Sequence, residues 1–494
     1  MHSQLSPCDQ SEPNDVSADQ KKLKGTQLLR LPLKVINVGV EGFARDLASA
    51  NVDVVHVSWM PPVGGDPLFA TLLAHLDGDE RIQAANDRAF QRILDGEPDL
   101  IDVQPAADVI PELRSDQVLL HAGPPITWDR MCGPMRGAIC GAIVYEGWAD
   151  NLESAERMAT QGEIEFHPNH HFGIVGPMTG IVTRSMPLFV VENQKFGNHA
   201  YSTINEGLGK VMRFGGNDSE VLARLYWLRD VLGPALSAAL RACKGIPLKT
   251  MVARGLMMGD EMHQRNVACT GIFLREISPY LAQTARSIQE LTQVLKCIGS
   301  NDQFFLNIAM AAAKSIIDQA RNIEGSSVVT AMCRNGTDFG IRLSGTNDQW
   351  FTAPVELPEG LYFPGFTAAD ANGDMGDSAI VETVGLGAFA MAASPAVVGF
   401  VGAGSSSAAN YTQTMREITI GESPVWTIPA LEFAGVPTGI DARLVAETSI
   451  APAINTGIAH KQAGIGQIGA GVARAPLACF TQGLKALSER MAEI

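Results

Sequence analysis

Apolar residues alternate with glycine-rich turns at the start of the chain in a pattern that indicates a β-α-β unit. An apolar run at residues 33–38 is followed by a glycine turn and a stretch of helical character, and a second apolar run spans residues 52–57. Two short apolar runs separated by a helix favour parallel strands. Residues 68–94 have leucine and isoleucine at helical spacing, and two short apolar runs follow before residue 120. We therefore predict a Rossmann-like domain at residues 29–120.

The same patterns divide the rest of the chain into three further regions. Residues 121–217 alternate Gly-Pro turns with short strands, which is typical of mixed α/β structure. Residues 218–323 carry apolar side chains at helical spacing in several segments, so we predict a helical domain. Residues 324–494 return to mixed strands and helices, whereas the polar residues 1–28 are predicted to be a disordered tail. The predicted fold class is α/β multidomain, with an N-terminal Rossmann-like parallel sheet unit, a central mixed α/β region, a helical insert domain and a C-terminal α+β domain.

Composition and charge narrow the class of protein. Apolar residues make up 46% of the chain, but no uninterrupted apolar run is long enough for a membrane span. The formal charge is −16 and no basic stripe offsets it, so we do not expect nucleic acid as a partner. The eight cysteines are scattered without a Cys-x-x-Cys pair, as is typical of reduced core residues in a cytoplasmic protein. Low charge and abundant glycine also fit large subunit interfaces, and we expect a homo-oligomer, most simply a dimer.

The first glycine turn lacks the pattern of a dinucleotide site. It reads Gly39-Val-Glu-Gly42, and the strand that follows does not end in the acidic residue that binds a ribose hydroxyl. A nicotinamide is therefore disfavoured, and we expect no cofactor. Two interpretations of this turn stay open. It binds a phosphate or a CoA-like group at the start of the helix, or it is needed only for packing.

The densest group of polar residues lies between positions 163 and 214, where glycines and prolines place side chains on turns. Histidine titrates near neutrality, so His170 and His171 are candidates for acid–base catalysis, together with Glu192 and the later His263. The neighbouring His167, Glu163 and Glu165 also offer metal ligands. Their spacing matches no standard motif, and adjacent histidines in a strand would point to opposite faces, so we expect no metal ligands.

Cationic and amide side chains around the same turns suit a small anionic ligand. Arginine donates paired hydrogen bonds to a carboxylate or phosphate, and amides beside a carboxylate can recognise a ureido group. Capping of turns and pairing with nearby carboxylates would explain many of the same residues. The candidate substrate-binding residues are Arg136, Asn193, Asn205, Glu206, Lys210, Arg213, Arg334, Asn335, Asp377, His460 and Lys461.

Several long motifs resemble those of one bacterial family. They are Trp59-Met-Pro-Pro-Val-Gly-Gly-Asp66, His121-Ala-Gly-Pro-Pro125, Met131-Cys-Gly-Pro-Met-Arg136-Gly, Asn205-Glu-Gly-Leu-Gly-Lys210 and Asn455-Thr-Gly-Ile-Ala-His460-Lys461. Over about residues 30–490 the chain resembles an FdrA-associated family that was long described as a domain of unknown function. One branch of this family, the AllG/YlbE type, is a subunit of oxamate carbamoyltransferase in allantoin breakdown. The resemblance implies an FdrA-like partner and the reaction of oxalurate with phosphate to give oxamate and carbamoyl phosphate.

Three functions follow from the sequence and stay open. In the first, the chain takes part in carbamoyl or acyl transfer, with phosphate attacking the carbamoyl carbon directly and one histidine acting as acid or base. In the second, it is a non-catalytic assembly or regulatory partner of a protein similar to acyl-CoA synthetases. In the third, it is a stand-alone, metal-assisted enzyme acting on a small amide or carboxylate.

Overall fold

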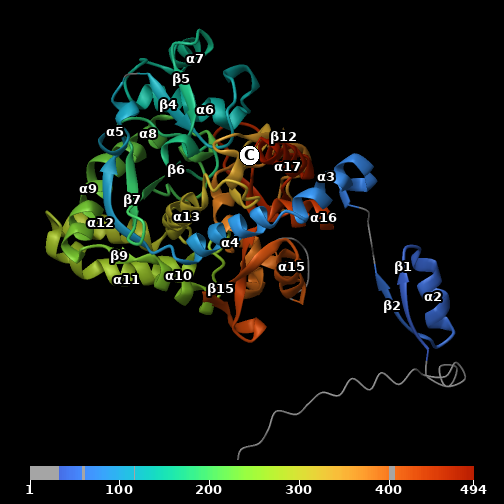
Figure 1. Ribbon diagram of the computed structural model, residues 1–494. Helices are drawn as coiled ribbons and strands as arrows, with labels where there is room; N and C mark the ends of the chain where they lie inside the picture. Colours follow the sequence, from blue (N-terminus) through green and yellow to red (C-terminus); the bar gives the residue numbers. More distant parts are fainter. Residues whose placement is uncertain (1–32, 58–61, 116, 400–405, 494) are drawn as a thin grey trace, which may run out of the picture. The chain divides into compact units, whose positions relative to one another are not determined.

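The computed structural model describes residues 33–57, 62–115, 117–399 and 406–493 (Figure 1). The chain forms two compact units, Met1–Met60 and Pro61–Ile494. The expected disordered tail at residues 1–28 lies outside the described residues. Within the described ranges, no helix combines the length and the apolar character that a membrane crossing requires.

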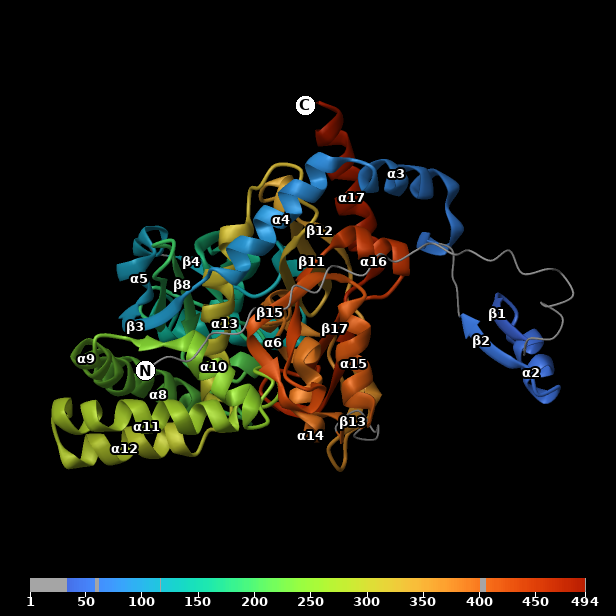
Figure 2. The ribbon, with the colours of Figure 1, turned by 60° about the horizontal axis from the view of Figure 1, so that its bottom comes forward.

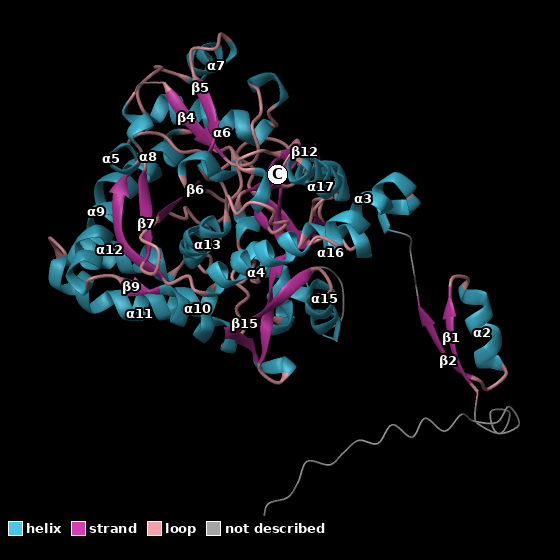
Figure 3. Ribbon diagram, viewed as in Figure 1, coloured by secondary structure: helices cyan, strands magenta, loops and turns pink. Residues whose placement is uncertain are grey.

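The first unit contains the predicted β-α-β arrangement. Strands β1 (Lys34–Val38) and β2 (Asp53–Val57) pair in parallel and are joined by α2 (Glu41–Ser49) (Figure 3). The later strands do not extend this sheet, because β3 (Pro98–Pro105) pairs antiparallel with β7 (Pro187–Asn193). The single parallel sheet expected for residues 29–120 is therefore a wrong prediction. Apolar runs indicate that strands exist, but they do not identify the partner of each strand.

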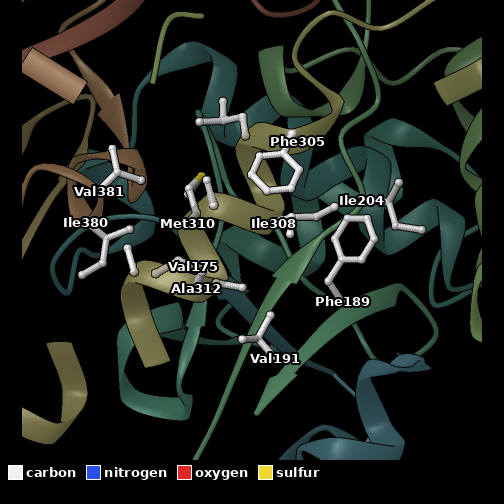
Figure 4. Close-up of a cluster of buried hydrophobic side chains, with 14 of the residues drawn as sticks. Val175, Phe189, Val191, Ile204, Phe305, Ile308, Met310, Ala312, Ile380 and Val381 are labelled. Carbon is white, nitrogen blue, oxygen red and sulfur yellow. The ribbon is translucent and has the colours of Figure 1, made fainter. Parts of the chain in front are cut away.

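The second unit contains a five-stranded sheet with a buried helix against it. The strand order is β6-β8-β7-β3-β9, in which β6 and β8 are parallel and the other pairs are antiparallel. Helix α13 (Phe304–Ile317) is buried along its whole length. Figure 4 shows Phe305 and Ile308 of this helix in one apolar cluster with Phe189 and Val191 of β7. The remaining strands of this sheet are β6 (Ile174–Val175), β8 (His199–Thr203) and β9 (Ile246–Pro247).

Helices dominate the segment between β8 and β10, as the apolar spacing predicts for residues 218–323. Helices α11 and α12 lie side by side (Figure 2). A π-helical turn at Leu228–Leu232 connects α8 to α9, and Pro234 stands in the first turn of α9, where proline is tolerated. The helices are α8 (Ser219–Trp227), α9 (Gly233–Cys243), α10 (Leu248–Met257), α11 (Val267–Thr284), α12 (Ile288–Gly299) and α13.

The C-terminal part contains three small antiparallel sheets. A four-stranded sheet has the order β12-β11-β10-β14, a three-stranded sheet the order β13-β18-β17, and β15 pairs with β16. A turn at Asn335-Gly336, a dipeptide typical of hairpins, joins β10 to β11. The strands are β10 (Val329–Asn335), β11 (Asp338–Leu343), β12 (Phe351–Pro354), β13 (Glu359–Tyr362), β14 (Met375–Gly376), β15 (Thr419–Ile428), β16 (Ala434–Ile440), β17 (Ala453–Ala459) and β18 (Gln467–Arg474).

Further helices cover these sheets and the β4–β5 pair. Residues 68–94, whose spacing is helical, lie in α3 and α4, and α17 belongs to the region 324–494 for which mixed strands and helices are predicted. Strands β4 (Val118–His121) and β5 (Glu165–Pro168) pair in parallel. The helices are α3 (Pro67–Asp77), α4 (Glu80–Leu94), α5 (Ala106–Val109), α6 (Gly133–Tyr145), α7 (Leu152–Thr160), α14 (Pro395–Val398), α15 (Ser406–Arg416), α16 (Ala442–Thr448) and α17 (Leu477–Ala492).

Candidate functional site

A small pocket with polar and apolar lining lies where distant parts of the second unit meet, and we call it the Arg213 pocket. Its free volume is about 10 Å³, which is about the room of one water molecule. A ligand of several heavy atoms therefore requires the pocket to widen. The lining residues are Pro177, Met178, Arg213, His263, Gln264, Gln303, Leu306, Ser378, Gly457 and Gln467.

Arg213 supplies the positive charge of this pocket. It lies in the short 3-10 turn Met212–Phe214, and its guanidinium donates to the carbonyl of Gly207 at 2.7 and 3.1 Å and to Oε1 of Gln303 at 3.4 Å. Burial lowers the pKa of Arg213 to about 10, against the attraction of Glu206, so the side chain stays charged at neutral pH. Both acceptors are neutral oxygens, and the buried carboxylate of Glu206 nearby offsets part of this charge.

Glu206 holds the turn that carries Arg213. Its carboxylate accepts the backbone N–H groups of Met212 at 2.8 Å and of Arg213 at 3.2 Å. Burial raises the pKa of Glu206, and these hydrogen bonds and the nearby Arg213 charge oppose that shift. Glu206 was predicted to bind substrate, but in this structure its contacts support Arg213.

His263 brings a titratable group to the same pocket. Its Nδ1 lies 2.8 Å from Oε1 of Glu382, which also accepts the N–H groups of Ala388 and Asn455 at 3.2 Å. A carboxylate only accepts hydrogen bonds, so Nδ1 carries the proton and Nε2 is free to accept another. Glu382 thus orients the imidazole in the way that a carboxylate orients a catalytic histidine.

The segment that presents His263 is a loop, although it lies inside the helical domain predicted for residues 218–323. Helix α10 ends at Met257, and Gly259 follows with φ +97°, a conformation that terminates helices. One oxygen of Glu261 then accepts the N–H groups of three successive residues, His263, Gln264 and Arg265. Its other oxygen accepts from Nδ2 of Asn455 at 2.8 Å, so this buried carboxylate ties the loop to β17.

A second buried polar cluster surrounds Asp377. Its carboxylate accepts the N–H groups of Gly123 at 2.8 Å and Gly176 at 3.0 Å, and Nδ2 of Asn169 at 3.0 Å. Burial raises the pKa of Asp377 to about 6, although these hydrogen bonds act in the opposite direction. The Nε2 atom of His170 lies 3.5 Å from this carboxylate. Two sequence-predicted residues, His170 and Asp377, therefore meet here.

Arg334 lies next to this cluster, and its guanidinium donates hydrogen bonds to groups of its own chain. Its guanidinium makes two hydrogen bonds to Asp374, at 2.7 and 3.2 Å, and donates to the carbonyl of Gly376 and to Oγ1 of Thr456. All of these contacts are buried. Arg334 therefore holds β10, β14 and β17 together, and its Nη1 also donates to Oγ of the pocket residue Ser378 at 3.4 Å.

The loop that follows β4 packs against these groups. Gly123 has φ +86°, and a Cβ atom at this position would lie 2.5 Å from the backbone carbon of Arg334. His121 is fully buried, with Nδ1 2.8 Å from the carbonyl oxygen of Ala122. Burial lowers the pKa of His121 to about 4. The His121–Pro125 motif thus provides a close fit between backbone segments.

The three predicted asparagines form turns and link elements. Asn193 accepts the N–H of Glu97 and donates to the carbonyl of Ser315. Asn205 accepts the N–H of Gly207, and Asn335 accepts the N–H groups of the two residues after Gly336. These contacts match the turn-forming alternative raised from the sequence.

The remaining predicted residues lie outside the lining of the Arg213 pocket. His171 is exposed and accepts a hydrogen bond from the indole of Trp350 at 3.0 Å, and it shares a 3-10 turn, rather than the expected strand, with the buried His170. Glu192 lies in β7 opposite His199. The others have these contacts: Arg136 stacks on Trp128, Lys210 pairs with Asp218, Nδ1 of His460 accepts the N–H of Gln462, and Lys461 donates to the carbonyl of Ala369.

Sequence reasoning missed most of the neutral polar lining. Gln264 stands next to the predicted His263, so its place in the chain provides a signal. Gln303, Ser378 and Gln467 come from separate segments, and no local motif marks them. The pocket therefore combines two predicted residues, Arg213 and His263, with side chains that only the tertiary fold brings together.

These features define a mixed α/β protein with a small buried pocket that carries an arginine, a carboxylate-oriented histidine and several amides. A family model described as "Oxamate carbamoyltransferase subunit AllG" matches residues 164–378. The chain is 51% identical over 412 residues to the oxamate carbamoyltransferase subunit AllG of Escherichia coli (strain K12), which covers 83% of this chain and 98% of that protein. The chain therefore belongs to the AllG family, as the sequence motifs predict.

Two further relatives extend this comparison. The uncharacterized protein YahG of Escherichia coli (strain K12) is 43% identical over 466 residues, which covers 94% of this chain and 98% of that protein. A crystal structure of a conserved protein of unknown function from Enterococcus faecalis V583 matches with a TM-score of 0.81 and 48% identity, and covers 83% of this chain and 98% of that chain. The fold of the second unit is thus similar to that of a solved protein.

Proposed function

We propose that this chain is a subunit of an oxamate carbamoyltransferase and that the Arg213 pocket binds its ureido substrate. The observation that carries this proposal is the meeting of three kinds of side chain in one pocket: a buried arginine, a histidine oriented by a carboxylate, and three glutamines. Oxalurate has a carboxylate at one end and a ureido group at the other. The family membership supports the same reaction at the level of the subunit.

Each part of the substrate has a suitable partner in the pocket. Nη1 of Arg213 can donate to the carboxylate, and a charge-assisted hydrogen bond of this kind is stronger than a neutral one. Gln264, Gln303 and Gln467 offer both N–H donors and carbonyl acceptors, which is what a ureido group requires. Nε2 of Gln264 is buried without a hydrogen-bond partner among the described residues, so a ligand carbonyl would satisfy it.

His263 is the proposed acid and base of the reaction. An oxygen of hydrogen phosphate attacks the carbamoyl carbon and gives its proton to Nε2 of His263. The bond from that carbon to the inner nitrogen then breaks, and the nitrogen takes the same proton as oxamate leaves. The products are carbamoyl phosphate and oxamate, and Glu382 stabilises the imidazolium between the two steps.

The narrowness of the pocket favours a reaction that depends on a partner protein. The free volume of about 10 Å³ does not admit oxalurate and phosphate together. We expect an FdrA-like protein to bind this chain and to open or complete the site. A homodimeric state in the cytoplasm remains part of this proposal.

The proposal is tested by measuring carbamoyl phosphate formed from oxalurate and phosphate, with and without the FdrA-like partner. We expect Arg213→Met to raise KM for oxalurate by about 10- to 100-fold, since one charge-assisted hydrogen bond is lost. We expect His263→Gln to lower kcat by about 100-fold or more. The control is Lys210→Met, because Lys210 is exposed, pairs with Asp218 and lies outside the pocket. Normal turnover in both pocket variants would exclude this pocket as the site.

A further inference from the structure

Three potential metal ligands from separate elements converge in the interior of the second unit. His170 lies in the 3-10 turn Asn169–Phe172, Cys333 lies in β10, and Asp377 follows β14. One ligand atom of each residue lies within 4.8 Å of the other two. All three side chains have 0% exposure. Such proximity of imidazole, thiol and carboxylate is not required by any local turn.

His170 provides an independent sign that a group is bound here. Both of its ring nitrogens are buried and have no hydrogen-bond partner among the described residues. An unsatisfied buried polar group costs about 1–3 kcal/mol, so native proteins rarely retain one without a reason. The contact with Asp377, at 3.5 Å from Nε2, is longer than a normal hydrogen bond.

We propose that His170, Cys333 and Asp377 bind a zinc ion. Zinc accepts sulfur, nitrogen and oxygen ligands together, and three protein ligands leave the fourth tetrahedral position for a water molecule. The site is separate from the Arg213 pocket, and its three ligands are buried. This inference replaces the sequence-based expectation that no residue ligates a metal.

The surroundings of Asp377 fit those of a metal ligand. Its carboxylate is already fixed by the N–H groups of Gly123 and Gly176 and by the amide of Asn169. Hydrogen bonds of this kind orient ligands before the ion binds. Backbone and amide donors also leave the carboxylate its negative charge, which a cation requires.

The charges around the cluster balance a divalent ion. A thiolate at Cys333 and a carboxylate at Asp377 contribute two negative charges, which Zn²⁺ neutralises once the thiol has released its proton. The cations nearby are paired with carboxylates of the same chain. Arg334 pairs with Asp374 at 2.7 Å. Lys314, Arg321 and Arg342 share two carboxylates, because Asp318 contacts Lys314 and Arg321, and Asp348 contacts Arg321 and Arg342.

The ion would join three parts of the chain. It would link the turn after β5, the central strand β10 and the segment that leads into Ser378. Ser378 lines the Arg213 pocket and directly follows the ligand Asp377. The ion therefore stabilises the wall of the pocket without taking part in it.

The test measures metal content and metal spectroscopy of the full chain. Protein purified from zinc-supplemented cells is passed through a chelating column, and zinc is counted by mass spectrometry. The same chain produced with cobalt is examined for the near-ultraviolet charge-transfer band of a cobalt–thiolate bond. The variant is Cys333→Ser, which keeps the size of the side chain. The matched control is Cys479→Ser, because Cys479 is also buried but lies outside the cluster.

We expect about one zinc ion per chain in the native protein and in Cys479→Ser, and a cobalt–thiolate band in both. Cys333→Ser should lose the band and at least tenfold in zinc affinity. A native protein that retains no zinc and gives no band overturns the proposal, and this result does not depend on whether the variant folds. A band that persists in Cys333→Ser also overturns it, because the thiolate would then come from another cysteine.

Discussion

Replacing His121 by asparagine should make the protein less sensitive to acid. His121 is fully buried at the end of β4, and burial lowers the pKa of its imidazole to about 4. In the unfolded chain a histidine has a pKa of about 6.5. Between these two values the unfolded state binds a proton that the folded state does not, so folding loses free energy as the pH falls.

The size of this effect follows from the two pKa values. At about pH 4.5 an unfolded histidine is almost fully protonated, whereas His121 in the fold, with a pKa of about 4, is mostly neutral. Proton linkage then gives a loss of roughly 2–3 kcal/mol from this one residue between about pH 7 and pH 4.5. His121→Asn removes the titrating group. The substitution changes the free energy of unfolding at every pH. The part of that free energy that varies with the protonation of His121 is lost.

The assay is the free energy of unfolding in urea at both pH values for the native protein and the variant. The control is His75→Asn, because His75 is exposed on α3. We expect the acid-induced loss to be smaller by about 2–3 kcal/mol in His121→Asn and unchanged in the control. An equal loss in the native protein and His121→Asn would show that this imidazole already takes up its proton in the fold, and the burial argument would be refuted.

Three further substitutions test the packing around the two polar clusters. Gly123→Ala should lower the free energy of unfolding by about 3 kcal/mol or more in thermal unfolding, because the added Cβ meets the backbone of Arg334. The control is Gly147→Ala, which should cost much less, because Gly147 also has a positive φ (+73°) but nothing lies within 4 Å of the added Cβ. Arg334→Met should lower the free energy of unfolding in urea by about 3–5 kcal/mol, since it leaves Asp374 buried and unpaired. Adding Asp374→Asn should recover part of that loss. No recovery would contradict a stabilising ion pair between Arg334 and Asp374. Glu382→Gln should lower kcat at least about tenfold with little change in KM, because the imidazole loses its orienting carboxylate, and an unchanged kcat would exclude that role.

Local patterns were sufficient to predict many of the elements. The spacing of apolar residues anticipated the helices α3 and α4 within residues 68–94, and the Asn335-Gly336 dipeptide is typical of the hairpin turn found between β10 and β11. These features depend on neighbours in the chain, so a short window of sequence contains the cause. The pairing of β3 with β7 was not predictable in this way, because it joins strands about 90 residues apart.

The same distinction applies to the candidate site. Arg213 and His263 were predicted because their residue types are rare and chemically distinctive within glycine-rich loops. Glu382 and Gln467 were missed because their importance comes from what they contact, at separations that no local spacing reveals. The buried ion pair of Arg334 was misread as an anion site for a related reason. A guanidinium looks the same in sequence whether its partner is a ligand or a carboxylate of its own chain.

The order in which the pocket residues occur along the chain has a consequence for its biosynthesis. The lining begins at Pro177 and ends at Gln467, so a ribosome must translate a further 290 residues after the first of them has been made. At roughly 5–20 residues per second, this takes between about 15 and 60 seconds. A nascent chain can therefore bury much of its five-stranded sheet early, but it acquires a complete pocket only near the end of translation. A premature stop before Gln467 would release a product that lacks this pocket, however well its first half folds.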